Sequence, residues 1–342
     1  MFHFVAKIEL SLGWVTSKQN LTLLRGLSSS LPFGVLLQTT VKHSIVFDGV
    51  GLHSGSAARL VVEPAQAGHG IVFRRADNAR DVADIPALWN LVNQSPLCTR
   101  LQNEHGVSVS TVEHIMAALM GCGVHNAVLT VDGPEVPILD GSSVSFVRGI
   151  LACGLDVLEA PVWALRVLKP VDVKRGDAWA RISPAEMLLI EFDISFSDAA
   201  IGTQKKRLNM SNGSFVRELS DSRTFCRKAD IDHMRANGLA RGGTLENAVV
   251  VDGEKVLSPG GLRHSDEAVR HKMLDALGDL ALAGAPLLGH YQGSRAGHAL
   301  TNDLLHALFD TPGALEWVEC DTQLAAKLPG AGVHWGEIPQ VA

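Results

Sequence analysis

The chain has 342 residues, of which 46% are hydrophobic and 19% are charged, and its formal net charge at pH 7 is −6. This length is sufficient for two domains of ordinary size with a substantial core. The negative charge and the lack of a long basic run argue against nucleic acid as a partner, and no stretch of about 18 apolar residues predicts a membrane span.

The cysteines and the first segment bear on the cellular compartment. Five cysteines without a C-x-x-C pair predict a reducing, cytoplasmic environment rather than a disulfide framework. Residues 1–38 contain one acid, Glu9, and several basic and serine residues, as a transit peptide does. We favour a disordered leader or a mistaken start codon, with the protein opening near Leu36 or Leu37, and exclude this segment from the fold prediction.

Short alternating apolar runs separated by glycine turns follow from Thr39, and they predict antiparallel strands with one solvent-exposed face. These runs cover residues 44–47, 58–62 and 70–73. A helix over 110–121, a strand over 124–131 and a helix over 142–154 come next. Ser110 and Glu113 are spaced as a capping box at the start of the first helix.

The second half repeats this order. Strands are predicted over 178–182, 188–196 and 247–251, and helices over 214–220, 228–237, 265–284 and from about Thr301. A sheet followed by helices, occurring twice, predicts an α+β fold. We expect two similar two-layer domains, residues 39–162 and 163–312, packed against each other with the active site between them. A weakly structured tail is predicted over 313–342.

Two distant segments, 111–114 and 270–275, carry residue types that bind metals. His271 and Asp275 are four residues apart on a predicted helix, so their side chains project from the same face. His114 would add a second imidazole and leave the fourth position of a zinc ion open, as in catalytic sites. The alternative is a solvated helix face, but short His and Asp side chains favour a metal site.

Three other residues could carry proton transfer. Glu113 lies beside His114, where a carboxylate could take a proton from a metal-activated water, although a capping role needs no catalysis. His298 follows a glycine-rich loop, and a lone loop histidine is more often structural. Asp279 could hold a nearby imidazole protonated, but the sequence leaves open whether Asp279 and His298 meet.

These segments resemble the signatures of the UDP-3-O-acyl-N-acetylglucosamine deacetylase family. Further similar segments are 49–55, 134–142, 222–225 and 297–300, in one order between about residues 40 and 311. The resemblance implies zinc-dependent hydrolysis of the 2-acetamido group of UDP-3-O-(3-hydroxyacyl)-N-acetylglucosamine. Acetate is released, and the reaction is the committed step of lipid A, and hence lipopolysaccharide, biosynthesis.

The resemblance also implies roles for individual residues. The ligands of the catalytic Zn²⁺, for which Fe²⁺ could substitute, would be His114, His271 and Asp275. Glu113 would be the general base, and His298, oriented by Asp279, the protonated general acid. Thr224 would stabilise the oxyanion together with the zinc, and Lys272 would supply positive charge nearby.

The family has an apolar passage for the fatty chain of the substrate, built largely by an inserted unit in the second domain. The positions that match substrate-binding residues are Phe225, Ile231, Ala240, Leu245, Ala248 and Val250, with His53 in the first matching segment and Cys98 near the zinc. Without the resemblance, core packing would be the favoured interpretation of the apolar positions. Small Ala240 and Ala248 would fit a channel whose width sets the acyl length.

One departure concerns the diphosphate of the substrate. Many relatives place a lysine just before a tryptophan, whereas this chain has Ala178 there. The candidates to replace that lysine are Lys174, Arg175 and Arg181, or nucleotide binding is weaker, and Arg295 matches another basic position of the family.

A metal- or lipid-binding protein without turnover is the alternative function. Glu113 and His298 discriminate between the two, because a binding protein needs neither a base nor an acid beside the metal. The expected protein is a cytoplasmic monomer with transient contact to the inner membrane surface.

Overall fold

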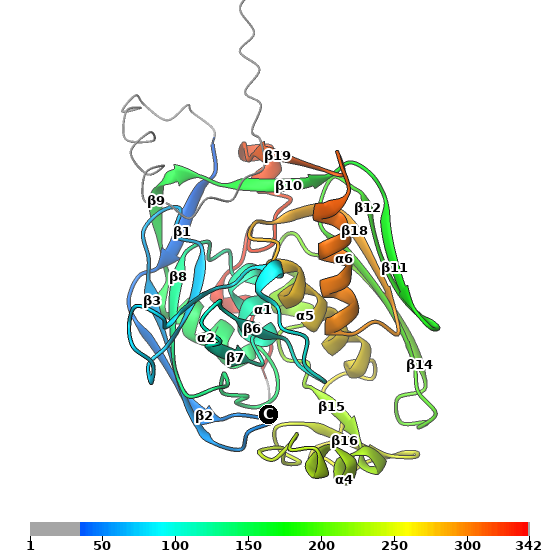
Figure 1. Ribbon diagram of the computed structural model, residues 1–342. Helices are drawn as coiled ribbons and strands as arrows, with labels where there is room; N and C mark the ends of the chain where they lie inside the picture. Colours follow the sequence, from blue (N-terminus) through cyan, green and yellow to red (C-terminus); the bar gives the residue numbers. More distant parts are fainter. Residues whose placement is uncertain (1–34, 341–342) are drawn as a thin grey trace, which may run out of the picture. The chain divides into compact units, whose positions relative to one another are not determined.

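In the described part of the chain, two main β-sheets carry the helices that form the site (Figure 1). The computed structural model describes residues 35–340. The predicted leader therefore lies largely outside the described residues, and the first strand, β1 (Leu37–Val41), begins two residues before the predicted start of the fold at residue 39. No helix within residues 35–340 is long and apolar enough to cross a membrane.

The first half of the chain builds a five-stranded sheet in the order β2-β3-β8-β4-β5. Its strands are β2 (Ile45–Val50), β3 (Ala57–Pro64), β4 (Ile71–Arg75), β5 (Asp84–Pro86) and β8 (Ala127–Asp132). Ala58, Leu60 and Val62 of β3 are buried, because alternate side chains of a strand point to the same face. Helices α1 (Glu113–Gly121) and α2 (Val144–Cys153) lie beside this sheet in Figure 1.

Two strand pairs and a short helix complete this half. Strand β1 pairs with β9 (Leu155–Pro161), and β6 (Arg100–Gln102) pairs with β7 (Ser108–Ser110). A 3-10 helix, η2, covers Trp89–Leu91.

The second half builds a seven-stranded sheet around β18 (Leu287–Ser294). Its other strands are β10 (Trp163–Val167), β11 (Val171–Arg175), β12 (Ala178–Pro184), β13 (Leu189–Ser195), β14 (Thr203–Asn209) and β19 (Leu315–Glu319). Strand β18 is antiparallel to β12 and parallel to β10 and β13. Helices α5 (Glu267–Ala281) and α6 (His298–Asp310) pack against strands of this sheet.

A small unit between β14 and α5 forms a third sheet. Strand β15 (Phe225–Arg227) is parallel to β16 (Val249–Asp252), which pairs antiparallel with β17 (Lys255–Val256). Helix α3 (Ser214–Glu218) precedes this unit, and α4 (Lys228–Ala236) lies within it. The predicted α+β fold with two sheet-plus-helix halves is confirmed, whereas the predicted domain boundary at 162/163 stays a prediction.

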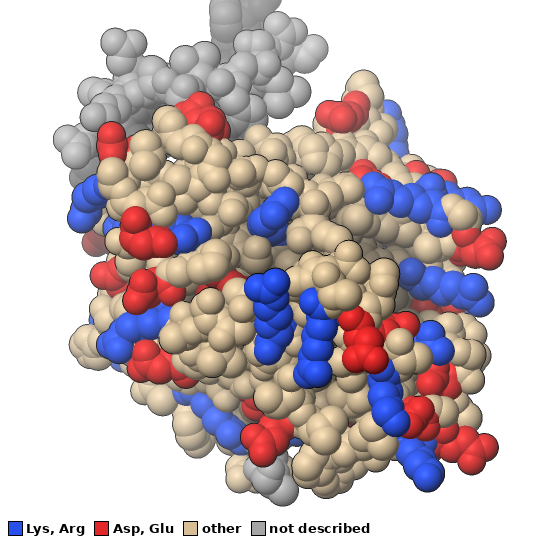
Figure 2. Space-filling model, turned by 60° about the horizontal axis from the view of Figure 1, so that its bottom comes forward, with Lys and Arg blue, Asp and Glu red and all other residues tan. Residues whose placement is uncertain are grey.

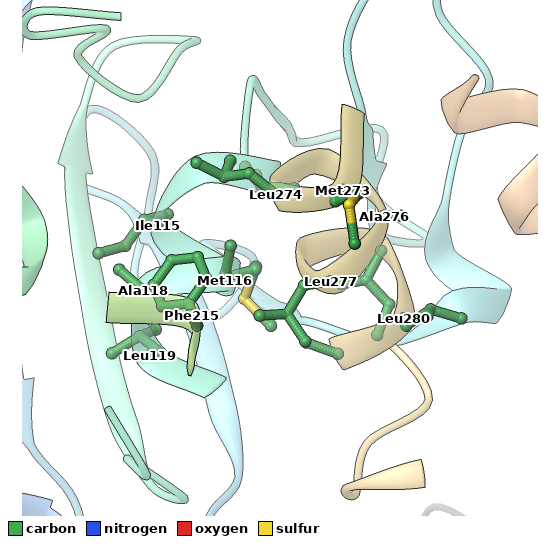
Figure 3. Packing of buried hydrophobic residues seen from close by; sticks show 14 of the residues in the cluster. Ile115, Met116, Ala118, Leu119, Phe215, Met273, Leu274, Ala276, Leu277 and Leu280 are labelled. Carbon is green, nitrogen blue, oxygen red and sulfur yellow. The ribbon is translucent and has the colours of Figure 1, made fainter. Parts of the chain in front are cut away.

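Helices α1 and α5 bring the two halves together. Figure 3 shows apolar side chains of both helices between them, with Met116 of α1 beside Leu277 of α5. Gly278 permits the close approach, because a Cβ atom there would lie 2.0 Å from the carbonyl oxygen of Glu113. Burying each large apolar side chain at this contact contributes about 1.5–3 kcal/mol to the stability of the fold. The contact therefore fixes the position of α1 relative to α5.

Two local predictions are wrong. Helix α1 begins at Glu113 after an N-cap residue, Val112, that has no side-chain capping bond, and Ser110 lies in β7 instead. The segment after residue 313 is structured, because β19 pairs with β10 along its whole length. Helix α7 (Thr322–Ala325) and the 3-10 helix η3 (Trp335–Glu337) follow it.

Candidate active site

The three predicted metal ligands converge at the contact between α1 and α5. His114 comes from α1, and His271 and Asp275 come from α5, one turn apart. Their ligand atoms all lie within 4.8 Å of one another, and all three residues are buried. Asp275 Oδ1 is 3.3 Å from His271 Nε2 and 3.6 Å from His114 Nε2.

The geometry of these groups fits a divalent cation. Asp275 Oδ1 is buried without a hydrogen-bond partner among the described residues, which is costly unless a cation or proton satisfies it. His271 Nδ1–H donates to the carbonyl oxygen of Ser222 at 3.0 Å, so Nε2 carries the lone pair that faces the site. Two imidazole nitrogens and one carboxylate form a three-ligand set typical of catalytic zinc.

The charges of the ligands also suit metal binding. Burial lowers the pKa of His271 to about 4, so its imidazole is neutral near pH 7. Burial alone would raise the pKa of Asp275, but the adjacent His271 and Lys272 outweigh it and lower that pKa well below its ordinary value. His271 and Asp275 are therefore ready to bind a cation without losing protons.

Glu113 lies beside the ligands, with its side chain directed into the site. Its Oε2 accepts a hydrogen bond from the backbone N–H of Thr99 at 3.0 Å, so the carboxylate does not cap its own helix. Its Oε1 lies 3.7 Å from His298 Nε2. Burial raises the pKa of Glu113, although the charges of His298 and His114 oppose this.

His298 and Asp279, whose meeting the sequence left open, are in contact. His298 Nδ1–H donates to Asp279 Oδ2 at 2.9 Å, and His298 is the first residue of α6 rather than part of a loop. Burial would lower the pKa of His298, but Asp279 and then Glu113 outweigh it and raise that pKa to about 9. The imidazole is therefore protonated at neutral pH.

Thr99 is a site residue that the sequence prediction missed. Its N–H binds Glu113, and its hydroxyl donates to Asp279 Oδ1 at 2.5 Å. Thr99 thus holds both the carboxylate of Glu113 and the carboxylate of Asp279, which in turn contacts His298. No signal in the sequence points to Thr99, because its partners lie 14 and 180 positions away.

Lys272 and Thr224 are two further residues of the predicted site. Lys272 Nζ donates to Asp275 Oδ2 at 2.8 Å; burial would lower the pKa of Lys272, but Asp275 outweighs it and raises that pKa. Thr224 is held by its N–H, which donates to Gly141 O at 2.8 Å. Both residues line the cavity described next.

A cavity of about 1280 Å³ opens from these groups. Besides the ligands, Glu113 and His298, the predicted residues that line it are Phe225, Ile231, Ala240, Leu245, Ala248, Val250, His53 and Arg295. Cys98, predicted among the substrate-binding residues, does not line it: the side chain is buried, and burial raises the pKa of its thiol to about 12.

The basic residues around the cavity distinguish among the candidates for the diphosphate. Ala178 lies directly opposite Arg175 in the β11–β12 pair, so the two side chains share a face. Both line the cavity, as does Arg295, whereas Lys174 and Arg181 do not. Figure 2 shows Lys and Arg side chains spread over the face at the bottom of Figure 1, several beside acidic residues.

The comparisons with known proteins agree with this geometry. Residues 38–310 match a family model described as UDP-3-O-acyl N-acetylglycosamine deacetylase. A Phenylobacterium zucineum (strain HLK1) protein named UDP-3-O-acyl-N-acetylglucosamine deacetylase is 47% identical over 279 residues, 82% of this chain and 95% of the relative. A Shewanella frigidimarina (strain NCIMB 400) protein of the same name is 41% identical over 306 residues, 88% of this chain and 100% of the relative. The chain therefore belongs to the UDP-3-O-acyl-N-acetylglucosamine deacetylase family.

Proposed function

We propose that this protein hydrolyses the 2-acetamido group of UDP-3-O-(3-hydroxyacyl)-N-acetylglucosamine, releasing acetate, as the committed step of lipid A biosynthesis. One observation carries the proposal. Glu113 Oε1 and His298 Nε2 lie 3.7 Å apart beside His114, His271 and Asp275. A metal with only three protein ligands keeps a coordination position for water or substrate. A binding protein would need neither an acid nor a base at that point.

We further propose that Zn²⁺ occupies the site, because two imidazoles and a carboxylate form one of the usual catalytic zinc sets. The same donors also accept Fe²⁺. When bound to His114, His271 and Asp275, the metal would supply Lewis acidity to the amide carbonyl and to the attacking water.

The protein groups supply the proton transfers. Glu113, whose pKa is raised by burial, is a base of suitable strength to take the proton of the attacking water. His298, protonated through its contact with Asp279, lies where it can give a proton to the leaving amine. Amide hydrolysis needs this step, because an unprotonated amide nitrogen is a poor leaving group.

The negative oxygen that develops on the carbonyl needs fixed positive partners in a site closed to water. Lys272 is bound to Asp275 and brings a positive charge to the metal site. Thr224 lines the same cavity with a hydroxyl group that can donate to the oxygen. Lys272 is already held by Asp275 on the same helix, and the backbone of Thr224 is held by Gly141.

The cavity also fits the two ends of the substrate. The apolar side chains from β15, α4 and β16 form a wall suited to a fatty chain. Arg175 lies opposite Ala178, Arg295 lines the same cavity, and we assign the diphosphate to these two guanidinium groups. A nucleotide substrate places the protein in the cytoplasm, where we expect a monomer with transient contact to the inner membrane.

The assignment of the diphosphate to Arg175 is tested by comparing Arg175→Ala with Arg181→Ala. Arg181 is the control because it lies on the same pair of strands but outside the cavity lining. Arg175 is about half exposed and already pairs with Asp303, so a loss of about 1 kcal/mol, or a roughly fivefold rise in KM, is expected. The kcat should not change. Equal KM values for the two variants would contradict the assignment.

The proposed activity is tested by metal analysis combined with a deacetylation assay on the UDP-sugar, before and after chelation. We expect about one zinc per chain, loss of acetate release on chelation and recovery when Zn²⁺ alone is returned. Deacetylation that survives complete metal removal would overturn the mechanism. Stoichiometric metal without any acetate release would favour the binding protein instead.

A further inference from the structure

We propose that Glu267 is a positioning residue for the metal ligand His271, and that it acts through the peptide unit joining Ser222 to Arg223. The carbonyl oxygen of Ser222 accepts from His271 Nδ1–H at 3.0 Å. The N–H of the same peptide unit, on Arg223, donates to Glu267 Oε1 at 3.0 Å. Two residues one turn apart on α5 therefore hold the two ends of one peptide group.

Glu267 is held in this position by further hydrogen bonds. Arg223 donates from Nε to Oε1 at 2.9 Å and from Nη2 to Oε2 at 3.2 Å, and the backbone N–H of Arg263 donates to Oε2 at 2.7 Å. The side chain of Glu267 is 1% exposed. Both carboxylate oxygens are thus committed, and the group is fixed relative to the peptide.

A carboxylate that accepts from this peptide N–H should strengthen His271 as a metal ligand. An anion that accepts from the N–H end of a peptide polarises it, and its carbonyl oxygen becomes a stronger acceptor. A stronger acceptor fixes the Nδ1–H tautomer of His271 and makes Nε2 a better ligand. Carboxylate–histidine pairs perform this task directly in many metal sites; here one peptide unit stands between them.

The competing explanation is that Glu267 and Arg223 form an ordinary buried ion pair that only stabilises the fold. The two explanations differ in what happens when both charges are removed. Neutralising both members of a buried pair is often tolerated by the fold. The polarising anion, however, is lost in that case as well.

The experiment compares Glu267→Gln, the double variant Glu267→Gln/Arg223→Met, and the control Glu337→Gln. Glu337 pairs with Arg217 and lies outside the cavity lining, so this control removes a carboxylate from an ion pair that does not contact the site. Affinity of the metal-free protein for Co²⁺ alone is measured from its visible absorption, against a competing chelator. Urea unfolding of the same metal-free samples reports stability.

We expect Glu267→Gln to weaken Co²⁺ binding by about 10-fold or more, as is typical of outer-shell partners, and Glu337→Gln to leave it unchanged. The double variant decides the question even where the single variant fails to fold: it should regain stability and still bind Co²⁺ weakly. Wild-type affinity in the double variant, or equal weakening in Glu337→Gln, would overturn the proposal. The inference rests on the proposed metal centre but uses no substrate, so a missing deacetylase activity would leave this result interpretable.

Discussion

The two sides of the cavity are held in different ways. The catalytic floor consists of Glu113, His114, His271, Asp275 and His298. Hydrogen bonds to specific partners hold the side chains of Glu113, His271, Asp275 and His298. The apolar wall consists of Phe225, Ile231, Ala240, Leu245, Ala248 and Val250, which line the cavity without such partners.

Part of the wall is also more exposed to solvent than the floor. His271 is 2% exposed on the floor, whereas Leu245 of the wall is 42% exposed. Helix α4, which contributes Ile231 to the wall, buries only Met234. In the proposed function, bond cleavage would therefore depend on a rigid set of contacts, whereas acyl-chain selection would depend on packing that can change independently.

The largest effect should come from removing a metal ligand of the floor. His271→Ala deletes one of three ligands, so the protein should retain no stoichiometric metal after dialysis and show no detectable acetate release. The matched control is His290→Ala, because His290 pairs with Glu191 and lies outside the cavity lining. Full metal occupancy in His271→Ala would show that the floor is built from other groups.

The next effect separates metal binding from turnover within the floor. Glu113→Gln keeps an oxygen that can accept from Thr99, so metal content should stay near one per chain. Loss of the base should lower kcat by about 10²–10⁴-fold. Metal analysis and kcat on the same sample check this, and near-normal turnover would mean that another group is the base.

A smaller effect concerns the pH range in which the floor works. In the proposed mechanism His298 acts protonated, so activity should fall as pH rises through the pKa of that residue, about 9. Asp279 is the largest cause that raises this pKa, so Asp279→Asn should lower it. The basic limb of the pH–kcat profile should therefore move to lower pH.

The shift is measured against the wild-type enzyme loaded with the same metal, so the charge of the metal affects both profiles alike. The acid limb, assigned to Glu113, should move much less. An unchanged basic limb in Asp279→Asn would remove His298 from the role of acid.

The smallest effect should come from the wall, and it should depend on the substrate. Ala248 is 7% exposed and lines the cavity, so Ala248→Leu should shorten the space for the fatty chain. We expect kcat/KM for long acyl chains to fall about 10-fold, within the range for a misfit in an apolar pocket. Short-chain substrates should be affected little.

The control is Ala236→Leu on α4, because Ala236 is exposed and does not line the cavity. A uniform loss for all chain lengths in Ala248→Leu would contradict the separation between floor and wall. It would mean that packing of the wall also sets the geometry of the metal site.

The sequence predicts the parts of this molecule that depend on local spacing. His271 and Asp275 are i and i+4 on a helix, so their shared face follows from helical periodicity. Together with the family resemblance, this was sufficient to place His114 with them. The α+β class likewise follows from the order of alternating and helical segments.

The parts that depend on distant contacts could not be predicted. Glu113 does not cap its own helix, because its carboxylate accepts a hydrogen bond from the backbone N–H of Thr99 on another segment. The tail after residue 313 is ordered because β10 supplies the hydrogen bonds of β19, which the sequence of β19 alone does not reveal. Thr99 itself matters only through Glu113 and Asp279, so no local pattern could have identified it.

The close approach at Gly278 limits how this enzyme could be made more heat-resistant. Replacing a glycine inside a helix with alanine ordinarily adds up to about 1 kcal/mol to stability. Here the added methyl would lie 2.0 Å from the backbone oxygen of Glu113, so α1 and α5 would have to separate. His114 lies on α1, whereas His271 and Asp275 lie on α5. Replacing Gly278 with alanine would therefore increase the distance between His114 and the other two ligands.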